Sequence, residues 1–265
     1  MARCRYYFRS EKSKDPCHEN NEDSFLHSRF TIMNDVGIDV MAVSDGIGGL
    51  SNGHVASHAA VTAFMETFYR EILELYTPYR KNLTCIHYCG ELKEAMVRAF
   101  AAANDNVLCT AASGIRQGAT LSAAVLAGDY LITGNIGDSP IYYYNKEENR
   151  MDQIAVLQTQ AEEDVMEGKY ERYSDAYFEN DYLLTYYMGQ YSKLPENLIH
   201  FHVQEKVMPG DQLLLVSDGA VGRMLPETVY ANLMSSDEEK ALSILFEEAL
   251  KDKDDDQTAM WIRIG

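Results

Sequence analysis

Two apolar stretches of this chain end in the same three residue types, at places where a strand would hold an acidic side chain still. Residues 41–43 lead into Ser44-Asp45-Gly46, and residues 214–216 lead into Ser217-Asp218-Gly219. The glycine after each aspartate has no Cβ, so the backbone can turn sharply and its carbonyl can approach a ligand. The repeated pattern predicts two rigidly held carboxylates at strand ends.

Acidic residues also flank three other predicted strands. Asp138 follows the strand 130–136, Asp256 precedes the last strand, and Glu22-Asp23 precedes the first. Each position alone is weak evidence, because an aspartate next to a strand is most often a turn residue. Together they carry more weight, since carboxylates gathered at one rim of a sheet repel one another unless cations lie between them.

This ligand chemistry predicts a centre of two divalent cations. Hard carboxylate and carbonyl oxygens select Mg²⁺ or Mn²⁺ over zinc. Gly46, Gly48, Gly49 and Gly53 would leave the side of Asp45 open for such ions, although the same glycines also fit a flexible loop at a helix start. A water between two metal ions becomes a hydroxide near neutral pH and can attack a phosphate ester directly.

The chain resembles the metal-dependent protein phosphatases, the PPM or type 2C family, over nearly its whole length. The similar segments, in the family's order, are Asn21-Glu22-Asp23, Asp45-Gly46-Ile47-Gly48-Gly49, Gly118-Ala119-Thr120 with Gly137-Asp138-Ser139, Ser217-Asp218-Gly219 and Asp256-Gln257-Thr258. The resemblance implies an α/β fold, a four-layer α-β-β-α sandwich in which helix pairs flank two antiparallel sheets. It also implies a single phosphatase domain over residues 1–265.

The resemblance assigns the main metal ligands. Asp45 would bridge both metals, the Gly46 carbonyl would bind one of them, and Asp218 and Asp256 would hold the other. Asp45 and Asp218 are thus the expected catalytic carboxylates. The implied cofactors are two Mn²⁺ or Mg²⁺ ions, with room for a third.

The remaining site residues also follow from the resemblance. Glu22 and Asp23 would act at the rim through metal-bound waters, and Asp138 would contribute to a third, weaker metal site. His18 stands three residues before Asn21, where the family commonly carries an arginine that grips the substrate phosphate. We therefore expect His18 in the phosphate site, with a weaker grip than arginine would give.

Several basic residues are candidates for two roles that have no assigned residue: binding the substrate phosphate with a positive charge, and protonating the leaving group. Arg3, Arg5 and Arg9 could supply the cation that His18 lacks, or they are solvated charges on a terminal strand. His54 or His58 could protonate the leaving group, or both are simply packed or solvated on the helix that follows the metal loop.

The implied activity is hydrolysis of phosphoserine or phosphothreonine in proteins that a Ser/Thr kinase has phosphorylated. Two alternatives stay open. The substitution by His18 is compatible with a weakly active pseudophosphatase that binds phosphorylated partners, and the metal pair would also suit a hydrolase of small phosphoesters. The chain has no GxxxxGKS loop, which argues against ATP use.

Hydrophobic periodicity predicts the elements that must position these residues. Apolar residues three or four apart predict helices over 55–76, 91–108 and 237–250. Short apolar runs bounded by turn residues predict strands over 24–33, 38–43, 119–127, 130–136, 140–145, 198–207, 211–217 and 257–264. The turns Gly128-Asp129 and Gly137-Asp138 predict an antiparallel meander from 119 to 145. Residues 158–181 are rich in Asp and Glu, and we expect an exposed acidic flap there.

The composition limits the kinds of partner that the protein can bind and the cellular compartment in which we expect it. The net charge of −18 argues against nucleic acid and anionic membranes, because both bind basic surfaces. The 5 cysteines are odd in number and form no repeated CxxC pairs, which argues against a disulfide framework and favours a reducing compartment. No apolar run reaches the length of a membrane span. We expect a cytoplasmic monomer.

Overall fold

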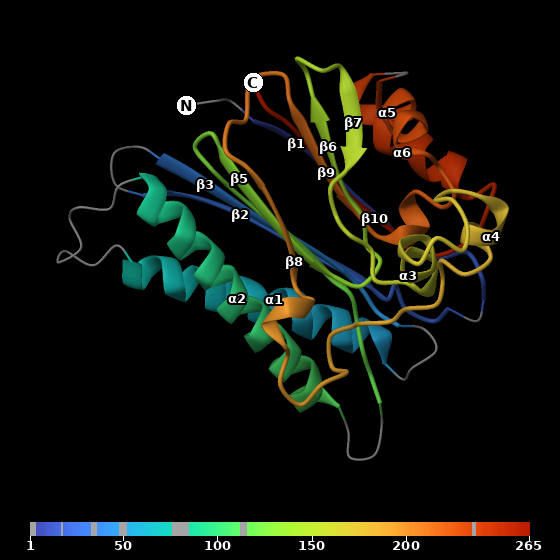
Figure 1. Ribbon diagram of the computed structural model, residues 1–265, viewed down its shortest axis with the longest axis horizontal. Helices are drawn as coiled ribbons and strands as arrows, with labels where there is room; N and C mark the ends of the chain where they lie inside the picture. Colours follow the sequence, from blue (N-terminus) through green and yellow to red (C-terminus); the bar gives the residue numbers. More distant parts are fainter. Residues whose placement is uncertain are drawn as a thin grey trace.

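Two antiparallel sheets lie face to face, and a pair of helices covers the outer face of each (Figure 1). The computed structural model describes residues 4–16, 18–32, 36–47, 52–75, 85–111, 116–234 and 237–265. The layers follow one another as helices, sheet, sheet, helices. The predicted α-β-β-α sandwich is therefore confirmed.

The first sheet has the strand order β2-β3-β4-β5-β8 and is covered by α1 and α2. Its strands are β2 (Asp23–Ile32), β3 (Val36–Asp45), β4 (Leu121–Ala127), β5 (Tyr130–Ile136) and β8 (His200–Gln204). The helices are α1 (Gly53–Leu75) and α2 (Cys85–Thr110). Each of these elements overlaps its predicted range, although α2 begins at Cys85 rather than at the predicted 91.

The second sheet has the order β1-β10-β9-β6-β7 and is covered by α5 and α6. Its strands are β1 (Arg5–Glu11), β6 (Ile141–Asn145), β7 (Arg150–Gln153), β9 (Gln212–Val216) and β10 (Gln257–Arg263). The helices are α5 (Pro226–Met234) and α6 (Glu238–Ala249), and a short 3-10 turn, η3 (Asp218–Ala220), follows β9. β1, β7 and α5 lie outside the ranges that were predicted from the sequence.

The central strands are buried on both faces, which explains why they appear in the sequence as unbroken apolar runs. In β3, Val40 and Ala42 pack against the helices α1 and α2, whereas Met41 and Val43 pack against the other sheet. In β9, Leu215 likewise faces the space between the sheets. Strands held from both sides fix the positions of the residues that end them, Asp45 and Ser217-Asp218.

The predicted meander is wrong for its third strand. β4 and β5 form the expected hairpin, but β6 lies in the other sheet, between β9 and β7. The chain leaves the first sheet at Gly137, which has a φ of +98° and whose added Cβ would lie 2.7 Å from Thr120 Cγ2. Glycine is required there for both reasons. The crossing places Asp138 between the ends of the two sheets.

The acidic segment 158–181 contains two short helices, α3 (Gln160–Met166) and α4 (Asp175–Phe178). Glu162 is only 1% exposed, and its carboxylate accepts hydrogen bonds from Arg172 and from the Tyr177 hydroxyl. Asp164 is also buried, and it is paired with Lys169. The expectation of an exposed acidic flap is therefore wrong for these two acids, because the segment pairs them internally.

Across the described ranges, the structure has no helix with an apolar stretch of the length that a membrane crossing needs.

A close backbone contact joins the end of β3 to the start of α1, and it yields a stability prediction. A Cβ on Gly46 would lie 2.3 Å from the backbone of Gly53, whereas a Cβ on Gly90 in α2 would meet nothing within 4 Å. We expect Gly46→Ala to destabilise the protein by about 1–3 kcal/mol through overpacking. Gly90→Ala, the matched control, should stabilise its helix by up to about 1 kcal/mol.

Urea unfolding midpoints of the two variants and the wild type measure this difference. Equal midpoints for Gly46→Ala and the wild type would contradict the close approach of β3 and α1.

Candidate metal centre

A cleft of about 350 Å³ opens at one rim of the sandwich, where strand ends from both sheets meet. Asp23 and Asp45 face each other in the register of β2 and β3, Asp218 follows β9, and Asp256 precedes β10. The cleft is lined by His18, Glu22, Asp45, Gly46, Ile47, Thr120, Asp138, Tyr182, Leu184, Asp218, Lys253, Asp254, Asp255 and Asp256. All the predicted site residues except Asp23 line it.

Asp45 is held by the backbone of a neighbouring segment. Its N–H donates to Thr120 Oγ1 at 2.9 Å, and its carbonyl accepts from the Thr120 N–H at 2.8 Å. The next N–H, that of Gly46, donates to the Glu22 carbonyl at 3.0 Å. These bonds fix the end of β3, so the Asp45 side chain starts from a defined position. Gly48 and Gly49 of the predicted open loop lie outside the described residues.

Asp23 lies beneath the cleft with one carboxylate oxygen lacking a partner. The side chain is 7% exposed, and Oδ2 accepts a hydrogen bond from Ser217 Oγ at 2.7 Å. The other oxygen, Oδ1, is buried and has no hydrogen-bond partner. Burial raises the pKa of Asp23 to about 8 against the lowering effect of the Ser217 hydrogen bond, and the charges of Asp218 and Asp256 add to the rise. An unpaired buried oxygen of this kind is suited to a cation.

Three further carboxyls have raised pKa values. Burial raises the pKa of Asp45 well above its usual value, and the charges of Asp23 and Asp218 add to this effect. Burial likewise raises the pKa of Asp138, together with the charge of Asp218. Half-buried Glu22 also has a raised pKa, first because of burial and then because of Asp256. The cleft therefore holds more negative charge than its own side chains can neutralise.

Two of the carboxylates of the cleft accept hydrogen bonds from the backbone. Asp256 accepts hydrogen bonds from the N–H groups of Ser13 and Glu22, both at 2.7 Å, and Asp218 accepts from the Gly219 N–H at 2.8 Å. In the described part of the chain, no group of three or more His, Cys, Asp or Glu side chains is already spaced to hold an ion. The donor set, made of carboxylates around an unpaired oxygen, nevertheless fits a hard divalent ion.

The cleft has two basic side chains among its described lining residues, His18 and Lys253. The His18 ring lies with Nδ1 3.8 Å from Asp256 Oδ2. Lys253 places Nζ 2.5 Å from Asp255 Oδ2. Burial alone lowers the pKa of Lys253, but the negative charges of Asp218 and Asp255 outweigh burial and raise it.

Sequence reasoning missed Lys253. It stands in the run Lys251 to Asp256, which reads as a solvated stretch of mixed charge at the end of a helix. Lys253 is three positions before the predicted metal ligand Asp256, and this short spacing is the feature of the sequence that could have indicated its place in the cleft.

The other basic candidates lie elsewhere. Arg5 pairs with Glu238 at 2.6 Å and Arg9 donates to Ser243 at 2.7 Å, so both contact α6 rather than the cleft. They therefore do not supply the cation that His18 lacks, and Arg3 lies outside the described residues. His54 and His58 are not among the residues that line the cleft, and His58 is exposed.

Comparison with known proteins identifies the family. The sequence model of the family described as protein phosphatase 2C matches residues 17–253. The match covers most of the chain, which therefore belongs to the protein phosphatase 2C family. No curated protein matches the chain by sequence.

Solved structures share the fold over the full length of the chain. The serine/threonine phosphatase PstP/Ppp of Mycobacterium tuberculosis is 22% identical, with a TM-score of 0.76 over 99% of both chains. The catalytic domain of PstP in complex with two manganese ions is 23% identical, with a TM-score of 0.74 over 100% of this chain and 99% of that one. The PPM phosphatase MsPP of Mycobacterium smegmatis, in complex with cacodylate, is 24% identical, with a TM-score of 0.69 over 98% and 97%.

Proposed function

We propose that this protein hydrolyses phosphoserine and phosphothreonine in proteins, using water activated by two Mn²⁺ or Mg²⁺ ions in the acidic cleft. The observation that carries the proposal is the group of mutually repelling carboxylates around the unpaired Oδ1 of Asp23. Membership of the protein phosphatase 2C family supports the reaction class. The two manganese ions bound by the PstP catalytic domain support the kind and number of metals.

In this proposal the chain supplies the metal ligands from strand ends. Asp45 would contact both ions, the Gly46 carbonyl would contact one, and Asp218 and Asp256 would contact the other. Bound divalent ions supply an activated water and draw charge from the phosphate oxygens. The hydrogen bonds of the Asp45 main chain to Thr120 favour this arrangement, because they fix the backbone position from which the carboxylate reaches into the cleft.

The remaining carboxylates would complete the site. Glu22 and Asp23 would act through metal-bound waters at the rim, which agrees with the unpaired oxygen of Asp23. Asp138 would contribute to a third ion together with Asp218, and the charge of Asp218, which helps to raise the pKa of Asp138, supports that pairing.

His18 and Lys253 would hold the substrate phosphate. A neutral imidazole donates a single hydrogen bond, whereas a lysine ammonium brings a full positive charge. Lys253 pairs with Asp255, and the charge of Asp218 also acts on it. Its ammonium group would contact phosphate oxygens in the cleft that it lines.

A metal-dependence assay tests the proposal. Phosphate release from a phosphothreonine peptide should require Mn²⁺ or Mg²⁺, and EDTA should abolish it. Asp45→Asn or Asp218→Asn should lower kcat by about a hundredfold or more, because an amide is a poor ligand for these ions. Asp105→Asn, which removes an exposed charge from α2, should leave kcat unchanged.

Binding of phosphopeptides with no turnover under any metal condition would instead favour a pseudophosphatase. Full activity in Asp45→Asn and Asp218→Asn would show that the cleft is not the catalytic centre.

The contributions of His18 and Lys253 to phosphate binding can be measured separately through KM. His18→Arg should lower KM for a phosphopeptide by roughly threefold to thirtyfold, because a guanidinium adds a charged pair of hydrogen bonds to phosphate. Lys253→Met should raise KM by a similar factor, with little change in kcat. Lys251→Met is the matched control, since Lys251 is exposed and pairs with Glu248.

Steady-state kinetics on one peptide measure all three variants. An unchanged or higher KM in His18→Arg would remove His18 from the phosphate site, and an unchanged KM in Lys253→Met would do the same for Lys253.

A further inference from the structure

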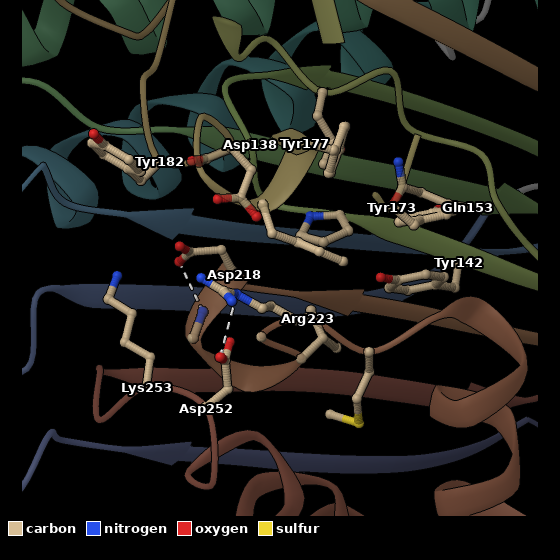
Figure 2. Close-up of a pocket in the computed structure, with 18 residues that line it drawn as sticks. Asp138, Tyr142, Gln153, Tyr173, Tyr177, Tyr182, Asp218, Arg223, Asp252 and Lys253 are labelled. Carbon is tan, nitrogen blue, oxygen red and sulfur yellow. Dashed lines mark hydrogen bonds and ion pairs between the residues drawn. The ribbon is translucent and has the colours of Figure 1, made fainter. Parts of the chain in front are cut away.

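A second cavity, of about 430 Å³, lies directly beside the metal cleft. Asp138, Tyr182, Asp218 and Lys253 line both spaces, so the two are separated by no more than these side chains (Figure 2). Its volume is within the range of ligand pockets in proteins. If the phosphate of a substrate lies in the metal cleft, the parts of the substrate next to that phosphate would therefore lie at the entrance of this cavity.

The interior of the cavity is aromatic. Tyr173, Tyr177 and Phe178, which follow α3 in the chain, line it together with Tyr142 of β6. Tyr173 packs edge-on against Tyr177 with ring centroids 5.7 Å apart, and Tyr177 packs in the same way against Phe178 at 5.4 Å. Stacked or edge-on contacts of this kind favour another aromatic ring as the occupant.

One polar group inside the cavity has no protein partner. Tyr142 is only 2% exposed, yet among the described residues its hydroxyl has no hydrogen-bond partner. Figure 2 shows this hydroxyl directed toward the interior of the cavity, on the side that faces Arg223. The neighbouring strand residues Tyr143 and Tyr144 both bond their hydroxyls, to Asp211 and Asn149. Tyr142 can therefore serve a hydrogen-bonding group on a ligand.

The backbone at Tyr173 is held in an unfavourable conformation. Its φ is +64°, a region that bulky side chains rarely adopt, and the other positive-φ residues besides glycine among the described ones are Asn52 and Asn149. Strain of this kind persists where the surrounding structure requires the side chain in a particular place. The Tyr173 side chain lines the cavity from this position.

The charges at the cavity argue against an acidic occupant. Four aspartates line it against two basic side chains, Arg223 and Lys253, and so disfavour an acidic side chain: Asp138, Asp181, Asp218 and Asp252. Arg223, paired with Asp252 at 3.3 Å, already lies over the Phe178 ring at 5.5 Å from its centroid. Because that guanidinium already occupies the cation-π position, a basic side chain would gain no such contact with the Phe178 ring.

We propose that this cavity binds a tyrosine or tryptophan side chain that flanks the phosphorylated residue of the substrate protein. The aromatic walls would stack on the ring, and the Tyr142 hydroxyl would bond its phenol or indole group. This inference rests on the proposed phosphatase function, since the occupant is defined by a phosphate bound in the adjoining cleft.

A set of phosphothreonine peptides tests the proposal with Mn²⁺ present. Each peptide carries alanine at the flanking positions except one, which is changed in turn to tryptophan, tyrosine, phenylalanine, lysine or glutamate. At one flanking position we expect kcat/KM to rise by roughly tenfold for an aromatic residue over alanine. Tyrosine should exceed phenylalanine there, and lysine and glutamate should give no gain.

Two variants of the cavity and one control locate the effect. Tyr173→Gly removes the ring and relieves the positive φ, so the protein should stay folded, lose most of the aromatic preference and keep its rate on the all-alanine peptide. Tyr142→Phe should abolish the advantage of tyrosine over phenylalanine and keep that of phenylalanine over alanine. Tyr69→Ala removes an exposed aromatic residue from α1 and should change neither preference.

The outcomes separate the two proposals. Hydrolysis of all peptides at equal rates, a preference for lysine, or an aromatic preference that survives in Tyr173→Gly would each overturn the aromatic subsite and leave the phosphatase function standing. No hydrolysis of any peptide with Mn²⁺ would overturn the proposed function and the subsite together.

Discussion

Repulsion between carboxylates at one rim of the sandwich is the constraint on which the rest of this structure depends. Asp23, Asp45 and Asp138 all have raised pKa values because burial and neighbouring negative charges disfavour their ionised forms. Such a cluster is unfavourable for folding, so its persistence has to be explained by something that the cluster binds. Divalent cations provide this explanation, because a bound cation attracts the carboxylates that otherwise repel one another.

The fold holds the cluster in place through close backbone contacts rather than through compensating charges. Gly46 approaches the backbone of Gly53, and an added Cβ on Gly219 would lie 2.2 Å from the Asp256 carbonyl oxygen. The side-chain amide of Gln257 donates to the Gly219 carbonyl at 3.0 Å. These contacts join the first sheet to α1 and the turn after β9 to the start of β10. The acidic residues are therefore fixed by their main chain, which leaves their side chains free to rearrange around a ligand.

The strand-end positions of the acidic residues could be predicted from the sequence because they depend on local signals. An apolar run followed by Ser-Asp-Gly marks a buried strand and its end, and both Asp45 and Asp218 were found in this way. The crossing at Gly137 could not be predicted, since the same turn residues serve a hairpin and a change of sheet. Contacts between residues far apart in the chain could not be predicted either. Arg5 pairs with Glu238, and Lys253 lines the cleft although its segment resembles a solvated stretch of charged residues.

Proton release on metal binding is the measurement that tests the central claim most directly. Calorimetric titration with Mn²⁺ near pH 7, in two buffers with different ionisation enthalpies, gives the number of ions bound and of protons released. Because carboxyls with raised pKa values must lose their protons to bind a cation, we predict two ions per chain and release of about one proton or more. Asp218→Asn should weaken the binding. Absence of Mn²⁺ binding, or binding that releases no proton, would contradict the account.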